Sequence, residues 1–196
     1  MMNRMSHTFN LMTDYRRLGE LLDFGATFCA FDTETTGLDA ESGRVIELGA
    51  VKFSRDGEIG TFRTLLDPLM PIPPEATRVN HITDGMVRGM PSERDVMPQF
   101  VEFSRDAVLV AHNAQFDLRF VNAALLRLGL GPLQNRAVDT LRLSRAAFPD
   151  AGRWRLGALA ARLSIDAGNA HRALDDALVC MKVFLSAAER LRPKCG

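Results

Sequence analysis

Two acidic residues end an apolar segment of this chain, and they constrain its fold more than any other feature. Residues 27–31 (TFCAF) are β-branched, aromatic or small, which is typical of a strand in a protein core. Asp32 and Glu34 follow directly. Because strand side chains alternate between faces, both carboxylates point to one side of the sheet and Thr33 points to the other. Carboxylates that share a poorly hydrated site repel each other, so the pattern predicts a cation between them.

The length and charge of the chain limit the kinds of protein it can be. Its 196 residues fit one domain, and a hydrophobic content of 46% is enough for a substantial core. The formal net charge is zero, so nucleic-acid binding would have to rely on a local basic patch. Only three of the 24 basic residues are lysines. The arginines suit phosphate binding, although a compositional bias of the genome explains them equally well.

The cysteines and the hydropathy indicate the compartment. Cys29, Cys180 and Cys195 lack CxxC spacing, which argues against a disulfide scaffold or a zinc cluster and favours a reducing, cytoplasmic setting. The first 24 residues contain no continuous apolar segment, and nothing elsewhere approaches 18 uncharged apolar residues. We therefore expect no signal peptide and no membrane span.

The hydrophobic periodicity predicts an α/β or α+β domain with a mixed sheet. A turn at 55–57 (RDG) predicts a hairpin, four prolines in 67–74 predict an extended loop, and Thr13 and Thr83 are candidate N-caps. Residues 1–25 are expected to form an N-terminal helical extension and residues 26–196 the main domain. The predicted strands cover 27–34, 45–53, 58–66 and 107–111, and the predicted helices cover 13–23, 92–103, 114–129, 140–147, 155–163 and 171–191, with a short helix after Thr83.

Further acids fall at positions that suit an active site. Asp117 lies in HNAQFD (112–117), just after the apolar strand 107–111, and sites in open α/β sheets form at such strand ends. Asp175 and Asp176 lie in HRALDD (171–176), at the start of the last helix. Any one of these acids alone is explained as well by the helix dipole, which favours negative charge at a helix start. That explanation does not apply to the acids that end the first strand.

A cluster of carboxylates without paired His or accompanying Cys predicts Mg²⁺ or Mn²⁺. Two such ions about 3.5–4 Å apart can activate a water and stabilise the leaving oxygen of a phosphodiester. His171 precedes Asp176 by five residues, at a transition from loop to helix. Because imidazole exchanges protons near neutral pH, His171 is a candidate general base for that water.

Three motifs resemble those of the DEDDh 3′–5′ exonucleases, in the same order: DTETTGLD (32–39), HNAQFD (112–117) and HRALDDA (171–177). The flanking segments IELGAV (46–51), NHITDGMV (80–87) and VDTLRLSR (138–145) are also similar, and the likeness is greatest to the epsilon-type proofreading exonucleases of bacterial DNA polymerase III. The resemblance covers about residues 26–190.

The resemblance implies a ribonuclease H-like fold, with a five-stranded mixed sheet flanked by helices. It also implies that two Mg²⁺ (or Mn²⁺) ions are held by acids and that His171 is the general base. Asp32, Glu34 and Asp176 would bind the first ion, Asp32 would share the second, and Asp117 would support the second directly or through water. By the same resemblance, the terminal nucleotide would be lined by Thr35, Gly37, Leu38, Val79 and Asn80, with His112 and Phe116 beside the 3′ end.

Two departures from the family pattern leave questions open. Relatives often carry His at the position of Asn80, whereas here His81 comes one residue later. The chain ends about twenty residues after Asp176, without the tail that ties the proofreading subunit to its polymerase, so the polymerase partner stays uncertain.

Three functions stay open at this point. The first is a 3′–5′ exonuclease acting on the 3′ ends of single-stranded or frayed DNA, favoured over RNA. The second is an RNA-directed exonuclease of the same family, since recognition of the 2′-OH depends on one or two contacts. The third is an inactive module that binds nucleic-acid ends, which the presence of all four acids and His171 disfavours. In each, an arginine-rich stretch is expected to hold the nucleic-acid backbone: Arg142, Arg145, Arg153 and Arg155.

Helix geometry makes one further prediction about the third motif. Residues four apart share a helix face and residues five apart lie about 140° from each other, so inside a helix Asp175 would share the face of His171 and Asp176 would not. The family pattern places the metal ligand five residues after the His. Both hold if His171 lies on the loop 168–171 and Asp176 in the first turns of the helix, which leaves Asp175 as a helix-start acid.

Overall fold

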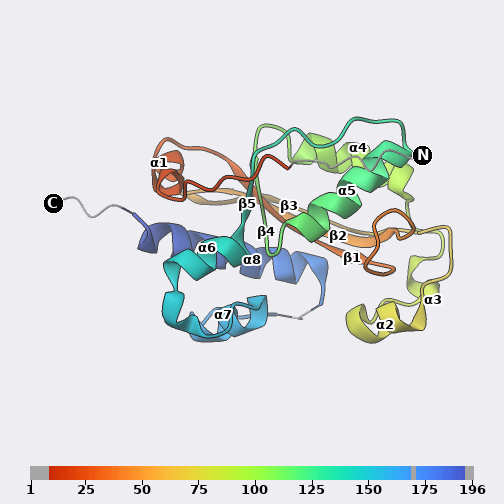
Figure 1. Ribbon diagram of the computed structural model, residues 1–196. Coiled ribbons are helices and arrows are strands. Elements are labelled where there is room, and N and C mark those ends of the chain that lie inside the picture. Colours follow the sequence, from red (N-terminus) through yellow and green to blue (C-terminus); the bar gives the residue numbers. More distant parts are fainter. Residues whose placement is uncertain (1–8, 169–170, 193–196) are drawn as a thin grey trace, which may run out of the picture.

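The computed structural model describes residues 9–168 and 171–192, and its centre is a mixed sheet of five strands (Figure 1). The order across the sheet is β3-β2-β1-β4-β5. β2 pairs antiparallel with both β1 and β3, while β4 runs parallel to β1 and β5 parallel to β4. The strands are β1 (Phe28–Thr35), β2 (Val45–Ser54), β3 (Gly57–Leu65), β4 (Val108–Ala111) and β5 (Ala137–Asp139).

Helices flank the sheet on both faces, which confirms the predicted architecture (Figure 1). α4 and α5 cover one face, α6 and α8 cover the other, and α7 packs on α8. Within the described ranges the helices are α1 (Arg17–Asp23), α2 (Pro74–Asn80), α3 (Asp84–Val87), α4 (Glu93–Phe103), α5 (Gln115–Arg127), α6 (Thr140–Ala147), the 3₁₀ turn η1 (Pro149–Ala151), α7 (Leu156–Arg162) and α8 (Ala173–Arg190).

The local predictions fail at a few elements. α1 begins at Arg17, so Thr13 does not cap it, and Thr83 lies at the N-cap of α3 without making a side-chain capping hydrogen bond. The prolines at 73 and 74 predict an extended loop, but proline is accepted in the first helical turn, and α2 begins at Pro74. β5 was not predicted from the periodicity, because three residues are too few to show one.

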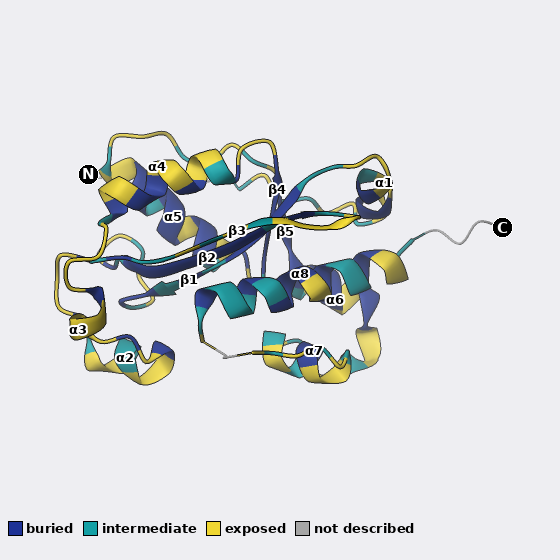
Figure 2. Cartoon of the chain, turned by 180° about the vertical axis from the view of Figure 1, so that it is seen from behind, coloured by how far each residue is buried: buried dark blue, intermediate teal, exposed yellow. Residues whose placement is uncertain are grey.

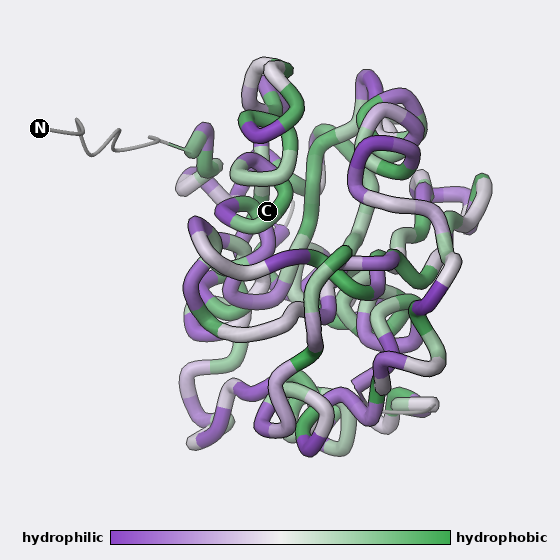
Figure 3. The backbone as a smooth tube through the Cα atoms, turned by 90° about the vertical axis from the view of Figure 1, so that its right-hand side faces the viewer, coloured by the Kyte–Doolittle hydropathy of each residue, from purple (hydrophilic) through white to green (hydrophobic). Residues whose placement is uncertain are grey.

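Alternation along β1 divides the core into two clusters. Phe28 and Ala30 pack with the residues of α8, while Cys29 and Phe31 pack with those of α4 and α5. Figure 2 shows β1 and β2 buried between these helices, and Figure 3 shows hydrophobic residues interleaved with hydrophilic ones along the outer helices. The same alternation turns Asp32 and Glu34 toward α8, because they continue the series of Phe28 and Ala30.

The first turn of α8 touches the backbone of β2 directly at Gly49. A Cβ atom at this glycine would lie 2.1 Å from the amide nitrogen of Leu174, which is closer than any real contact. The absent side chain therefore sets the distance between sheet and helix, and it brings the N-terminal end of α8 to the ends of β1 and β2.

The N-terminal segment packs on the same domain. Leu18 and Leu22 of α1 belong to the core cluster around α8, and the amide of Met12 donates a hydrogen bond to the carbonyl of Ala137 on β5 (2.8 Å). None of the helices described in the structure has the length and hydropathy needed to cross a membrane.

Candidate active site

The acids of the first and third motifs meet where β1 ends and α8 begins. Ligand atoms of Glu34, His171 and Asp176 all lie within 4.8 Å of one another. Asp32, His171 and Asp176 line one cavity of about 980 Å³. Two segments 137 or more residues apart in the sequence thus form one acidic site, as the motifs predicted.

His171 lies outside the helix, which confirms the prediction from helix geometry. Its φ of 63° is left-handed, and α8 begins two residues later at Ala173. The backbone N–H of His171 donates to Oδ2 of Asp176 (3.1 Å), which occupies the first turns of α8. The carboxylate of Asp176 therefore anchors the backbone of His171.

Asp117 lies on the other side of the sheet from α8. It is 3% exposed, and its Oδ1 accepts hydrogen bonds from the amide (3.0 Å) and the hydroxyl (2.7 Å) of Thr33. Thr33 points to the face opposite Asp32, so Asp117 stands behind the cavity rather than in its lining. The carboxylate of Asp117 is close enough to Asp32 to raise its pKa. It does not belong to the set of ligand atoms that Glu34, His171 and Asp176 bring together.

The environment of these carboxyls favours their protonated form when no cation is present. Burial, strengthened by the carboxylates of Asp176 and Glu47, raises the pKa of Glu34 to about 8. Burial likewise raises the pKa of Asp117 to about 7, although the hydrogen bonds from Thr33 oppose the rise. Burial and the neighbouring acids hold the pKa of Asp32 well above its ordinary value, and burial raises that of Asp176. A bound cation would relieve this repulsion.

The sequence analysis missed Glu47 as a site residue. It lies on β2 directly opposite Glu34 and is fully buried. Its carboxylate accepts hydrogen bonds from Nε (3.1 Å) and Nη2 (2.8 Å) of Arg172 and from the amide of Ala173 (3.3 Å). Since Arg172 follows His171 directly, this ion pair ties the start of α8 to the sheet. The signal was present in the sequence, as a lone acid within the apolar segment 45–51.

The residues predicted to line the terminal nucleotide fall into two kinds. Leu38 and Val79 are apolar yet 84% and 57% exposed, which suits contact with a base. The hydroxyl of Thr35 donates to the carbonyl of Gly37 (2.7 Å) and so shapes the turn after β1. Asn80 is 2% exposed; its Nδ2 donates to the carbonyl of Thr35 and its Oδ1 accepts from the amide of Ile82. Asn80 thus holds α2 against the end of β1, and its contact with substrate stays a prediction.

Of His81, Phe116 and His112, the cavity is lined by His112 alone. His81 is exposed and ends α2 with a left-handed φ of 59°. Phe116 is half-buried against Phe120, with ring centroids 5.0 Å apart. His112 lines the cavity, and both of its ring nitrogens have partners: Nδ1 the hydroxyl of Thr140 (2.9 Å) and Nε2 the carbonyl of Trp154 (2.8 Å).

These contacts define the state of His112. Burial lowers its pKa, so its neutral form is favoured near neutral pH. A carbonyl can only accept a hydrogen bond, and therefore Nε2 carries the proton and donates it to Trp154. His112 consequently fixes the backbone of Trp154, just before α7, in the wall of the cavity.

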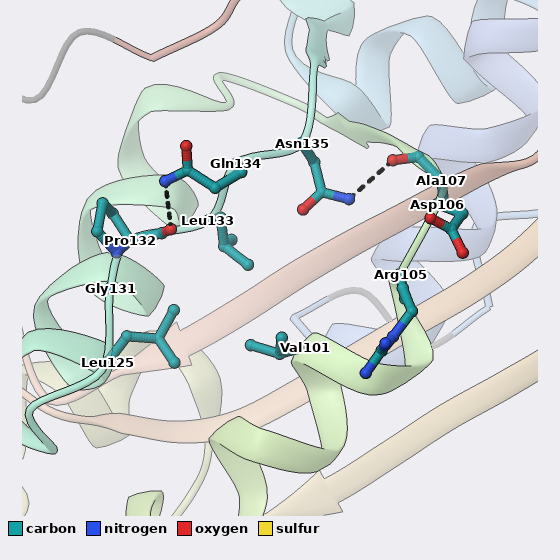
Figure 4. Close-up of a pocket in the computed structure, with 10 residues that line it drawn as sticks. All are labelled: Val101, Arg105, Asp106, Ala107, Leu125, Gly131, Pro132, Leu133, Gln134 and Asn135. Atoms are coloured by element: carbon teal, nitrogen blue, oxygen red, sulfur yellow. Dashed lines mark hydrogen bonds between the residues drawn. The ribbon is translucent and has the colours of Figure 1, made fainter.

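A second cavity, of about 520 Å³, lies beside the N-terminal end of β4 and is lined by none of the predicted site residues (Figure 4). Its wall includes Asn135, whose amide Nδ2 donates to the carbonyls of Ala107 (2.9 Å) and Ser104 (3.0 Å). The side-chain amide of Asn135 is thus engaged by backbone carbonyls, so the acidic cavity is the better candidate for an active site.

Comparison with known proteins agrees with this assignment. The sequence model of the RNase T family, described as an exonuclease, matches residues 29–184. DNA polymerase III subunit epsilon of Treponema pallidum is 48% identical over 159 residues, which cover 80% of this chain and 74% of that protein. The PolC-type DNA polymerase III of Clostridium perfringens is 39% identical over 170 residues, which cover 86% of this chain but only 12% of the much longer relative.

Solved structures share the fold. Exonuclease I of E. coli in complex with a dT13 oligonucleotide superposes with a TM-score of 0.73 at 20% identity, covering 80% of this chain and 40% of that one. Exonuclease X in complex with 5′ overhanging duplex DNA gives a TM-score of 0.66 at 26% identity, covering 82% of this chain and 90% of that one. The ribonuclease H-like fold is thereby confirmed. The chain belongs to the RNase T exonuclease family, as its motifs predicted, and it is a 3′–5′ exonuclease.

Proposed function

We propose that this protein removes nucleotides from the 3′ ends of single-stranded or frayed DNA by a two-metal mechanism in which His171 is the general base. The observation that carries the proposal is the meeting of Glu34, His171 and Asp176 within 4.8 Å, in a cavity that Asp32 also lines. The relatives that belong to DNA polymerase III support DNA as the substrate and proofreading as the role.

The donor set fits divalent ions of the Mg²⁺ and Mn²⁺ class. All four acids offer hard oxygen ligands, and the raised pKa values of Asp32 and Glu34 reflect burial and the mutual repulsion of carboxylates while no cation is bound. Asp32, Glu34 and Asp176 would hold the ions, with Asp117 behind Asp32 as support. Such ions, when bound, activate a water and stabilise charge on the phosphoryl oxygens.

The residues of the chain supply the remaining steps. His171 accepts a proton as the water oxygen forms its bond to phosphorus, and the bond from phosphorus to the 3′ oxygen of the remaining strand breaks. That oxygen takes a proton from solvent, which leaves a free 3′-OH and releases a nucleoside 5′-monophosphate. Leu38 and Val79 contact the terminal base, and the turn at Gly37 lets the backbone approach it.

The same relatives support a proposal for the partner and the compartment. The similarity to an epsilon subunit supports association with a replicative polymerase, and hence a cytoplasmic location in a bacterium. Cys29 and Cys180 are free and buried, which is consistent with a reducing setting.

Strand digestion tests this proposal. DNA and RNA of matched sequence, each labelled at the 5′ end, are incubated with Mg²⁺ or Mn²⁺, and the products are resolved by length. We expect a ladder that shortens from the 3′ end on DNA, no cleavage in excess EDTA, and survival of a circular single strand.

A different result would contradict each part of the proposal. Full activity in EDTA would overturn metal dependence, and cleavage of the circle as fast as of the linear strand would identify an endonuclease. Faster digestion of RNA than of DNA would make the protein an RNA-directed member of the family.

A further inference from the structure

Two arginines beside the acidic cavity have no acidic partner among the residues that the structure describes. Arg153 and Arg155 precede α7, are exposed, and line the cavity that holds Asp32, Asp176 and His171. Over residues 9–168 and 171–192 neither guanidinium takes part in an ion pair or a side-chain hydrogen bond. Both are therefore available to a ligand that carries negative charge.

The other two arginines of the arginine-rich stretch, Arg142 and Arg145, already contact side chains of the protein. Nε of Arg142 lies 3.7 Å from the carboxylate of Asp139, and the guanidinium of Arg145 lies 5.9 Å from the centre of the Trp154 ring. Neither lines the cavity. The structure thus separates the four arginines into two that stabilise the fold and two that face the site.

Trp154, which lies between the two available arginines, is attached at three points. Its carbonyl accepts a hydrogen bond from Nε2 of His112 (2.8 Å) and its indole Nε1 donates to the carbonyl of Phe148 (3.1 Å). The guanidinium of Arg145 covers its ring. The flanking arginines are consequently presented at a defined place rather than on a free loop, which lowers the entropy lost when they bind.

The position of this segment indicates which part of a substrate it meets. Leu38 follows β1 and Val79 belongs to α2, whereas Arg153 and Arg155 lead into α7. α2 and α7 lie on opposite sides of the N-terminal end of α8 (Figures 1 and 2). A strand with its last nucleotide beside α2 and its scissile phosphate at the acids therefore continues toward α7.

We propose that Arg153 and Arg155 form a subsite for the phosphodiester backbone of the substrate strand, on the 5′ side of the bond that is cut. The subsite rests on the proposed exonuclease function and extends it. The planar guanidinium fork matches phosphate oxygens, and in a chain of zero net charge a local pair of this kind supplies the attraction. A strand reaches the subsite, whereas a single nucleotide at the terminal site does not.

Salt dependence of binding tests the subsite. The variant Arg153→Gln/Arg155→Gln is compared with Arg16→Gln/Arg136→Gln, which removes the same charge elsewhere. Arg16 precedes α1, and Arg136 precedes β5 at the end of the sheet opposite the acids. Binding of a 5′-fluorescein dT12 oligonucleotide is followed by anisotropy from 50 to 300 mM NaCl, with Ca²⁺ replacing Mg²⁺. The length of the oligonucleotide is checked after each titration.

We expect the slope of log K against log salt to flatten by about 0.7 for each phosphate that the protein no longer neutralises, hence by about 1.4 in the Arg153→Gln/Arg155→Gln variant. At 0.1 M salt this corresponds to roughly 25-fold weaker binding. The control variant should keep the slope of the unaltered protein. Inhibition by the mononucleotide dTMP should be unchanged in both variants.

The outcomes distinguish a failure of the arginine subsite from a failure of the proposed exonuclease function. Equal slopes in the two double variants would overturn the subsite while hydrolysis by the unaltered protein still supports an exonuclease. Weaker inhibition by dTMP in the Arg153→Gln/Arg155→Gln variant would place the arginines at the terminal nucleotide instead. Absence of hydrolysis by the unaltered protein would overturn the proposed function itself.

Discussion

Two sets of buried or half-buried acids lie at the same end of the sheet and differ in what surrounds them. Glu47 is bound by the Nε and Nη2 atoms of Arg172, and Glu93 is bound in the same way by Arg127. Each also accepts a backbone N–H. The acids of the second set form no ion pair with Lys or Arg in the part of the chain that the structure describes: Asp32, Glu34, Asp117 and Asp176.

The difference separates acids that hold the fold from acids that we propose bind a cation. A buried carboxylate with a bidentate arginine is neutralised by the protein itself. Among the unpaired acids, burial and mutual repulsion together raise the pKa of Glu34 to about 8. Substitutions in the two sets should therefore act on different quantities: activity for the unpaired acids, and stability for the paired ones.

The largest effect is expected from Asp176→Asn. Removing this proposed metal ligand should lower the single-turnover rate at saturating Mg²⁺ roughly a thousandfold, or about 4 kcal/mol of transition-state stabilisation. Asp175→Asn, one residue away on the first turn of α8, should keep most of the activity. The reverse ranking of the two variants would overturn the assignment of the metal ligand.

A smaller and mixed effect is expected from Glu47→Gln. The change leaves Arg172 without its counter-charge, so the free energy of unfolding should fall by about 2–3 kcal/mol in urea titrations. Because Arg172 follows His171, kcat should also fall, by about tenfold, with little change in KM. Glu93→Gln is the matched control: it should lose similar stability yet keep kcat within a few-fold. Equal kcat values in the two variants would make Glu47 a purely structural acid.

The smallest effect concerns the pH dependence of stability without metal. In the unfolded chain these carboxyls lose their protons near pH 4, whereas in the folded chain the pKa values are about 7 for Asp117 and about 8 for Glu34. The folded form binds more protons between these limits, so the free energy of unfolding falls as the pH rises through that window. In EDTA we expect Tm to drop by about 5 °C from pH 5.5 to pH 8.5.

Excess Mg²⁺ should restore the Tm at pH 8.5, since a cation at the site replaces the protons. The variant Asp32→Asn in EDTA should show a flatter pH dependence, because one source of repulsion is gone. A Tm in EDTA that rises from pH 5.5 to pH 8.5 would contradict the electrostatic account of the unpaired acids.

Several features of this protein could be predicted from local sequence. Alternation along β1 placed Asp32 and Glu34 on one face, because a strand has a period of two residues. The resemblance to the exonuclease family places the metal ligand five residues after the His, and helix geometry then predicts that His171 precedes the helix; α8 does begin at Ala173. The first prediction depends only on strand geometry, and the second also needs the family pattern.

Other features depend on residues distant in the sequence, and only the tertiary structure decided them. Glu47 and Arg172 are 125 positions apart, and nothing local indicates that they pair. The four arginines of the basic stretch look alike in the sequence, yet two are engaged by Asp139 and Trp154 while two face the cavity. Local periodicity determines which face a side chain takes, whereas the partner across that face is set by how strands and helices pack.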